Sequence, residues 1–237
     1  MELERITQAL CRAVKRLRFS PPVSYVYNPL EYAWKPHARY LQLYGRPPKE
    51  VVLVGMNPGP FGMAQTGVPF GEVTIVRDWL GISDEVAKPK SEHPRRPVEG
   101  FNCRRSEVSG RRFWGWVKGR FGTPERFFAR FYVYNYCPLL FMDEAGRNLT
   151  PDRLPVADRD PLFLVCDRAL RQVVEDMRPS LVVGVGGFAE GRARKVLHDL
   201  NLRIGCLLHP SPANPHANRD WDRIADRVFE ELRVRIP

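Results

Sequence analysis

The sequence VVLVG at residues 51–55 runs directly into MNPGPFGM at residues 56–63. The first segment is an unbroken apolar run, which is typical of a strand covered on both faces of a parallel sheet. The second begins a tight turn, because three glycines and two prolines fall within Gly55–Met63. Asn57 therefore sits at a strand end, where side chains project into the crevice that binds ligands in α/β folds. A purely structural turn is the alternative interpretation.

Three further apolar runs alternate with segments of helical periodicity. The runs span residues 131–136, 181–185 and 204–208, and the helical stripes lie in Leu162–Met177, in Ala189–Leu200 and between Trp221 and Leu232. This alternation predicts an α/β sandwich wound around a mostly parallel sheet. No internal repeat or long linker divides the chain, so we expect residues 1–237 to form a single domain. The segment 87–98, rich in proline and arginine, is the best loop candidate.

Composition argues against several classes of protein. No apolar run approaches the length of a bilayer span, so we expect no membrane partner and a cytoplasmic location. In a bacterium we expect association with the nucleoid, and in a eukaryote a nuclear location. Residues 1–18 carry an apolar stripe, which predicts an amphipathic helix on the core rather than at a membrane surface. The five cysteines form no C-x-x-C pair. We therefore expect reduced thiols and no metal site.

Basic residues are concentrated in one segment of the chain. The net charge is +10, and residues 88–130 contain twelve basic and four acidic side chains. A cluster of this kind is typical of a surface that binds a polyanion such as nucleic acid. A solvated basic face is the alternative.

Two more polar segments follow predicted strands. Residues 134–138 are YNYCP and place Asn135 at the end of the second strand. An amide can pair with O4 and N3–H of uracil, whereas cytosine presents the reversed pattern; a turn cap is the alternative role. Residues 208–218 are LHPSPANPHAN, a proline-stiffened loop that opens with His209. A lone histidine is more often structural, but this one shares the predicted sheet edge with Asn57.

These segments together resemble the single-strand-selective monofunctional uracil-DNA glycosylases, a branch of the uracil-DNA glycosylase superfamily. The similarity runs from about Pro21 to the C-terminal helix. It includes residues 55–77, RSEVSG at 105–110, CPLLF at 137–141, GRNLTP at 146–151, and residues 209–218. The resemblance implies a three-layer α/β/α sandwich around a four-stranded, mostly parallel sheet. It also implies a monofunctional hydrolase of base excision repair that cleaves the N-glycosidic bond of uracil and related damaged bases in DNA.

The resemblance places catalysis on Asn57 and His209. In such enzymes the glycosidic bond breaks largely before water attacks, leaving an oxocarbenium-like sugar and a uracil anion. His209 would donate a hydrogen bond to O2 as charge develops there, and Asn57, which does not titrate, would position the water. Because water is the nucleophile, we expect no amine–sugar intermediate, no lyase activity and no cofactor. Lys195 is accordingly interpreted as surface charge.

The same resemblance assigns the binding of the base and of the strand. It places base stacking on Phe70, base recognition on Asn135, and backbone contacts to the base on Gly59 and Met63. DNA, single- or double-stranded with the damaged base flipped out, is the implied partner of a monomeric protein. The expected DNA contacts are Ser211, Pro212, Ala213 and Asn214 in the loop after His209, and Arg104, Arg105, Arg111 and Arg112 in the basic segment. Family members carry a wedge in this loop, and Ala213 stands where a bulky arginine is expected.

Two other functions stay open on the sequence alone. One is a sister glycosylase that prefers deaminated purines such as xanthine or hypoxanthine, and the other is a catalytically silent protein that binds damaged DNA. A dinucleotide site is disfavoured, although residues 184–189 match G-x-G-x-x-A. The next strand is followed by His209 rather than by the acidic residue that such a site needs, so the match predicts a tight turn.

Overall fold

Four parallel strands form the centre of the protein in a computed structural model that describes residues 1–237. They are β2 (Val51–Gly55), β3 (Phe131–Asn135), β6 (Leu181–Val185) and β7 (Arg203–Leu207), in the order β3-β2-β6-β7. The predicted strands are confirmed; β3 ends one residue before the predicted end, and β7 is shifted by one residue. Because all four strands are parallel, their carboxyl ends meet at one edge of the sheet.

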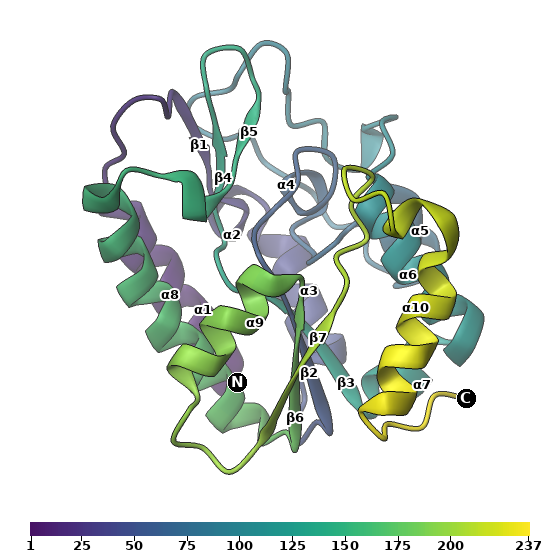
Figure 1. The fold of residues 1–237 in the computed structure, drawn as a ribbon. Helices are drawn as coiled ribbons and strands as arrows, with labels where there is room; N and C mark the ends of the chain where they lie inside the picture. The colour runs from purple at the N-terminus through teal and green to yellow at the C-terminus, as the bar shows by residue number, and fades with distance from the viewer.

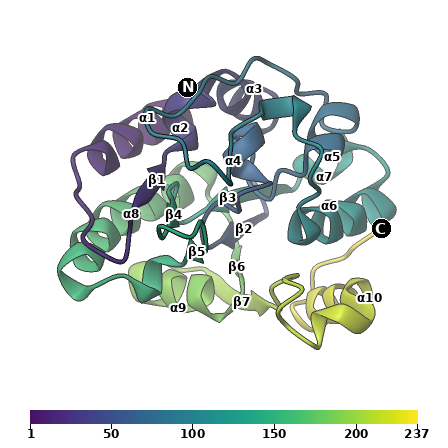
Figure 2. The ribbon, with the colours of Figure 1, turned by 90° about the horizontal axis from the view of Figure 1, so that it is seen from above.

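Helices cover both faces of this sheet and confirm the predicted α/β/α sandwich (Figure 1, Figure 2). One layer holds α1 (Glu2–Lys15), α8 (Val156–Met177) and α9 (Gly187–Val196), and the other holds α6 (Val108–Phe121), α7 (Pro124–Phe128) and α10 (Ala217–Glu231). The apolar stripe of α1 is buried, which confirms that this helix packs on the core. None of the helices combines the length and the apolar character that a membrane crossing requires.

Several helix boundaries differ from the sequence-based prediction. Helix α8 begins at Val156, six residues before the predicted start, and contains Pro161. Pro161 is the sixth residue of this helix, so the helix lacks the backbone hydrogen bond that a residue at this position would donate to Ala157 O. Helix α9 ends at Val196, four residues early. The segment 87–98 forms neither helix nor strand, as predicted.

The remaining helical elements of the fold are shorter than α1. Among them, α3 (Trp34–Tyr44) packs beside β3. The other short elements are α2 (Pro29–Tyr32), α4 (Met63–Thr66) and α5 (Val73–Asp78), with 3-10 turns at Gly100–Asn102 and Pro151–Arg153. Tyr40 of α3 donates from Oη to the carbonyl of Val133 at 2.8 Å. This bond occupies an acceptor on the edge strand that would otherwise be available to another chain.

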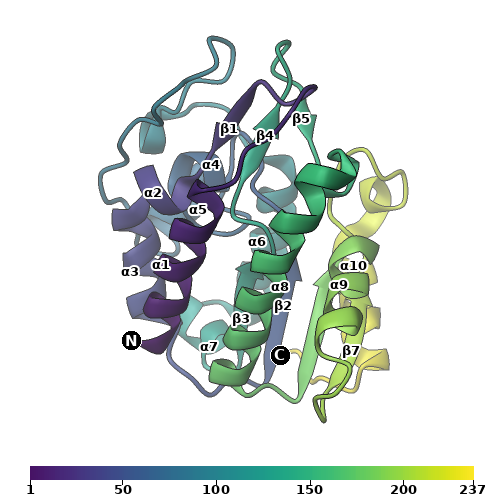
Figure 3. The same cartoon turned by 90° about the vertical axis from the view of Figure 1, so that its left-hand side faces the viewer.

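A second, antiparallel sheet was not predicted. It contains β1 (Tyr25–Tyr27), β4 (Leu140–Met142) and β5 (Asn148–Leu149) in the order β1-β4-β5. Strands of two or three residues are too short to show an alternating pattern, which explains why the sequence did not reveal them. Figure 3 shows this sheet above the carboxyl ends of the main strands, where it forms part of the wall of the site described next.

Candidate active site

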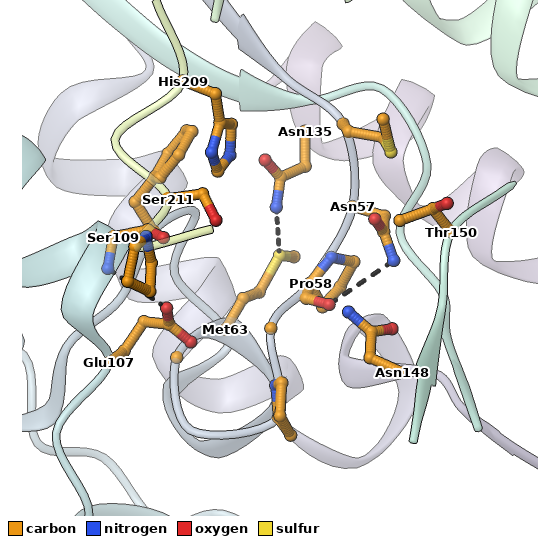
Figure 4. Close-up of a pocket in the computed structure, with 16 residues that line it drawn as sticks. Asn57, Pro58, Met63, Glu107, Ser109, Asn135, Asn148, Thr150, His209 and Ser211 are labelled. Atoms are coloured by element: carbon orange, nitrogen blue, oxygen red, sulfur yellow. Dashed lines mark hydrogen bonds between the residues drawn. The ribbon is translucent and has the colours of Figure 1, made fainter. Parts of the chain in front are cut away.

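A cavity of about 370 Å³ opens at the carboxyl edge of the main sheet (Figure 4). Its walls come from segments that are far apart in the chain: the turn after β2, the end of β3, the loop after β7 and the β5 hairpin. Eight of the residues predicted from the sequence line it, namely Asn57, Gly59, Met63, Phe70, Asn135, His209, Ser211 and Pro212. Parallel strands and their crossovers therefore bring the predicted base-binding and catalytic groups to one place.

Asn57 is held by two backbone carbonyls. Its Nδ2 donates to Leu139 O at 3.2 Å and more weakly to Pro58 O at 3.4 Å. These bonds fix the amide orientation, because only the nitrogen can donate. The side-chain oxygen is thereby left free to accept a hydrogen bond.

Asn135 ends β3 opposite Gly55, the last residue of β2. Its side chain is buried, with Nδ2 directed at the thioether of Met63 at 3.2 Å. Sulfur is a weak acceptor, so the amide keeps capacity for a stronger partner. A Cβ on Gly55 would overlap Asn135 Oδ1 and lie 2.7 Å from the ring of Phe70, which explains the glycine at this position.

Phe70 is held in an uncommon backbone conformation, with φ of +54°. Left-handed backbone at a bulky residue costs free energy and persists only where the surroundings enforce it. Here α6 supplies that support: the Phe70 ring stacks on Phe113 with centroids 4.7 Å apart, and Trp114 donates to Pro69 O at 3.2 Å. One ring face is thus covered by protein, and Phe70 also lines the cavity.

His209 follows β7 and lies with its ring 6.0 Å from that of Phe70. Burial lowers the pKa of His209 from 6.5 to about 4, because desolvation disfavours the imidazolium. The ring is therefore neutral at physiological pH and can donate one N–H. The preceding residue is anchored, since Trp221 donates from Nε1 to Leu208 O at 2.7 Å.

The loop after His209 is braced by hydrogen bonds of its own and by α6. Asn214 N–H donates to Ser211 O at 3.0 Å, and Asn218 Nδ2 donates to Pro212 O at 2.9 Å. Arg112 donates to Pro210 O at 3.2 Å and to Asn218 Oδ1 at 2.9 Å. Ala213 is exposed at the tip, outside the cavity lining.

The four predicted phosphate-binding arginines fall into two groups. Arg112 supports the loop, whereas Arg104, Arg105 and Arg111 are exposed. The Arg105 guanidinium lies 4.4 Å from the ring centroid of Phe61, which follows the cavity-lining Pro60. A cation–π contact of this kind holds the charged group beside the cavity mouth.

Several polar residues of the cavity were missed in the assignment of roles from the sequence: Glu107, Ser109, Asn148 and Thr150. All four fall inside segments that carry the family resemblance, and that location was the available signal. Glu107 caps α6, accepting from Ser109 N–H at 3.3 Å, and burial raises the pKa of its carboxyl.

Other titratable groups lie outside the site. All five cysteine thiols are free, and no group of three or more His, Cys, Asp or Glu side chains is arranged to hold a metal ion. Lys195 is exposed on α9.

The G-x-G-x-x-A match forms the predicted tight turn: a Cβ on Gly184 would lie against the backbone of Glu190, and Gly186 has a φ of +96°.

Comparison with known proteins gives consistent matches over nearly the whole chain. The sequence profile of the family described as "Uracil DNA glycosylase superfamily" matches residues 43–233. The single-strand selective monofunctional uracil-DNA glycosylase of Rattus norvegicus is 52% identical over 221 residues, covering 92% of this chain and 80% of the relative. The corresponding Bos taurus protein is also 52% identical and is covered to 81%. The crystal structure of wild-type SMUG2 from Pedobacter heparinus superposes with a TM-score of 0.68 over 96% of this chain and 97% of that chain; at 19% identity it supports the fold alone.

Proposed function

Because the chain belongs to the uracil-DNA glycosylase superfamily, we propose that it hydrolyses the N-glycosidic bond of uracil and related damaged bases in DNA, without lyase activity, as a step of base excision repair. The observation that carries this proposal is the arrangement of Asn57 and His209. An amide oxygen and a neutral imidazole, from the ends of β2 and β7, line the same cavity. No titrating general base is needed if the bond breaks before water attacks.

Asn57 would position the attacking water. Its Nδ2 donates to Leu139 O, so Oδ1 is the group that accepts a hydrogen bond from the water. Holding the nucleophile in place replaces a costly loss of translational freedom by a preformed geometry. An oxocarbenium-like sugar needs little further activation of the water.

His209 would stabilise the departing base. A neutral N–H that donates to O2 becomes a stronger partner as negative charge develops on the uracil anion. Burial strengthens this interaction, because the surrounding dielectric is low. The lowered pKa of His209 supports a neutral donor rather than an imidazolium.

The remaining cavity residues would select the base. Phe70 offers the ring face that Phe113 does not cover, and Asn135 offers an uncommitted amide to the O4 and N3–H edge. The backbone at Gly59 and Met63, in the turn after β2, would contact the base as well. A cytosine placed in the same way would leave buried polar groups unpaired.

DNA would lie across the cavity mouth. We propose phosphate contacts from Arg104, Arg105 and Arg111, and contacts from Ser211 to Asn214 of the braced loop, with Arg112 fixing that loop. The residues 1–237 supply every group named here, so we propose a single domain that acts as a monomer in the compartment that holds the DNA.

Release of free base from end-labelled DNA tests this proposal. The substrates carry uracil, xanthine or hypoxanthine, each in a single strand and in a duplex. Single-turnover rates are compared for the unaltered protein, Asn57→Ala and His209→Ala. We expect uracil release with intact sugar–phosphate backbone, and a loss of at least about a hundredfold in each variant, the scale of one electrostatic donor. DNA binding should survive within a few-fold, because phosphates supply most of the affinity. Preferential release of a purine would favour the sister activity, and binding without release would identify a silent binding protein.

A further inference from the structure

The turn that carries Asn57 is held from two sides. On the side of α6, a Cβ on Gly59 would overlap Glu107 Oε2, and a Cβ on Gly62 would lie 3.0 Å from Glu107 Cγ. This close packing restricts the glycine turn itself. The amide of Asn57 is oriented from the other side, because its Nδ2 donates to Leu139 O at 3.2 Å. The water that Asn57 would position therefore depends on what holds the Leu139 carbonyl in place.

Cys137, just after β3, contacts both the turn and Leu139. Its N–H donates to Met56 O at 2.9 Å, and Met56 directly precedes Asn57. Its Sγ accepts from Leu139 N–H at 3.5 Å and lies 3.9 Å from Leu139 O, where an S–H donates only a weak bond. One fully buried residue thus holds the residue before Asn57 and the residue that orients the Asn57 amide.

The thiol of Cys137 is the acceptor for a buried N–H. Leu139 is 2% exposed, and no backbone carbonyl accepts from its N–H. A buried donor that loses its acceptor is costly, so the bond to Sγ restrains the backbone of Leu139. Short polar side chains that bond the backbone two residues ahead are typical of tight turns, and the thiol takes that role here. Pro138, between the two residues, has a fixed φ and cannot donate a bond of its own.

We propose that Cys137 is a positioning residue for the attacking water, because its thiol holds Leu139 in the conformation that points the Leu139 carbonyl at the Asn57 amide. The inference rests on the proposed function of Asn57. Without the sulfur acceptor, the Leu139 N–H turns toward another partner, and the carbonyl of the same residue moves with it. The Asn57 amide then loses its stronger bond and no longer presents Oδ1 to the water in one fixed direction. Contacts to the phosphates are not affected.

Single-turnover release of uracil at saturating protein concentration, with DNA binding measured separately, tests this role. Cys137→Ala and Cys137→Ser have side chains of nearly the same size and differ in the acceptor. Cys137→Ala should lower the rate about tenfold, the scale of one unsatisfied buried donor, and leave the affinity for uracil-containing DNA unchanged. Cys137→Ser restores an acceptor oxygen and should return the rate to within about threefold of the unaltered protein. All rates are measured at a temperature at which circular dichroism shows each variant to be folded.

Cys166 of α8 provides a matched control. It is buried as completely as Cys137, and its thiol hydrogen-bonds to Cys137 but not to Leu139. Burial raises the pKa of the Cys166 thiol well above its usual value, so this neighbour stays uncharged. Cys166→Ala removes a thiol from the same cluster, and it should lower the free energy of unfolding without changing the rate.

A double-mutant cycle separates positioning from a general loss of packing. In the Asn57→Ala background, Cys137→Ala should lower the rate no further, because the amide that it positions is gone. An equal loss of rate in Cys166→Ala, no recovery in Cys137→Ser, or a full additional loss in the Asn57→Ala background would each overturn the inference. Failure of the unaltered protein to release uracil would overturn the proposed function instead.

Discussion

At the scale of single residues, burial decides the chemical state of the groups proposed to be catalytic. His209 could be a cation or a neutral donor on sequence grounds alone, because an unperturbed imidazole titrates near pH 6.5. The structure lowers its pKa to about 4 through desolvation, which selects the neutral form. The orientation of the Asn57 amide is fixed in the same indirect way, by the carbonyl of Leu139, a residue 82 positions away.

A neutral His209 predicts the pH profile of the reaction. Between pH 5.5 and 8, roughly, the single-turnover rate should show no inflection from His209, because the ring stays unprotonated above its pKa of about 4. The measurement is a rate profile of the unaltered chain beside His209→Gln. The carboxyl group of Glu107 also titrates, so the same profile in Glu107→Gln isolates its contribution. An inflection near pH 6.5 that vanishes only in His209→Gln would contradict the neutral donor.

At the scale of elements, the ends of the main strands could be predicted from the sequence, but the walls of the cavity could not. Apolar runs with Asn57, Asn135 and His209 at or just after their ends were enough to place three side chains on one sheet edge. The β5 hairpin escaped prediction because its strands are very short, and the position of Glu107 depends on how α6 packs against the turn after β2. Contacts of this second kind arise from tertiary packing and leave no periodic signal in the sequence.

The loop after His209 can be tested at its tip. Ala213 is exposed, and a methyl group fills little of the space that an extruded base leaves. Ala213→Arg should therefore raise the single-turnover rate on uracil paired with adenine most, on G·U less, and on single-stranded uracil least. The loop's internal hydrogen bonds should let it carry the new side chain without refolding. Equal gains on all three substrates, or none, would show that another residue is the wedge.

The four arginines proposed to act at the DNA separate into three exposed side chains and Arg112, which braces the loop after His209. The logarithm of the DNA-binding constant falls linearly with the logarithm of the salt concentration. Replacing Arg104, Arg105 and Arg111 together by Gln should make this slope shallower by roughly one for each phosphate that the variant no longer neutralises. Arg112→Gln removes its two bonds to the His209 loop, so it should lower the cleavage rate more than the salt slope. Equilibrium binding at several salt concentrations, with single-turnover rates, distinguishes the two. An unchanged salt slope in the triple variant would show that the phosphate contacts lie on another surface.

At the scale of the whole molecule, desolvation keeps His37 and His209 neutral and so makes stability depend on pH. His37 donates from Nδ1 to Gly67 O at 2.7 Å, and burial lowers its pKa from 6.5 to about 4. The unfolded chain therefore binds more protons than the folded chain between these values. Stability from His37 is fully present above pH 6.5 and is lost as the pH falls through about 4.

Removal of His37 should flatten this dependence. His37→Asn keeps a donor for Gly67 O and cannot titrate, so its free energy of unfolding should fall less between pH 7 and 4.5 than that of the unaltered chain. The full effect of one such histidine is on the order of 3 kcal/mol. Urea unfolding at both pH values measures it, with the exposed His216→Asn as control. A pH dependence identical in all three proteins would show that His37 is not kept neutral by folding.

The overlap between Glu107 and the glycine turn also constrains how related sequences can diverge. A side chain at position 59 and a glutamate at position 107 claim the same volume, and position 62 is nearly as tight. A side chain at position 59 would require the Glu107 carboxylate to move, and one at position 62 would require a small shift of Glu107, whereas a smaller residue at 107 would remove both contacts. Positions 59, 62 and 107 should therefore covary across the family, with a change at 107 preceding any change in the turn.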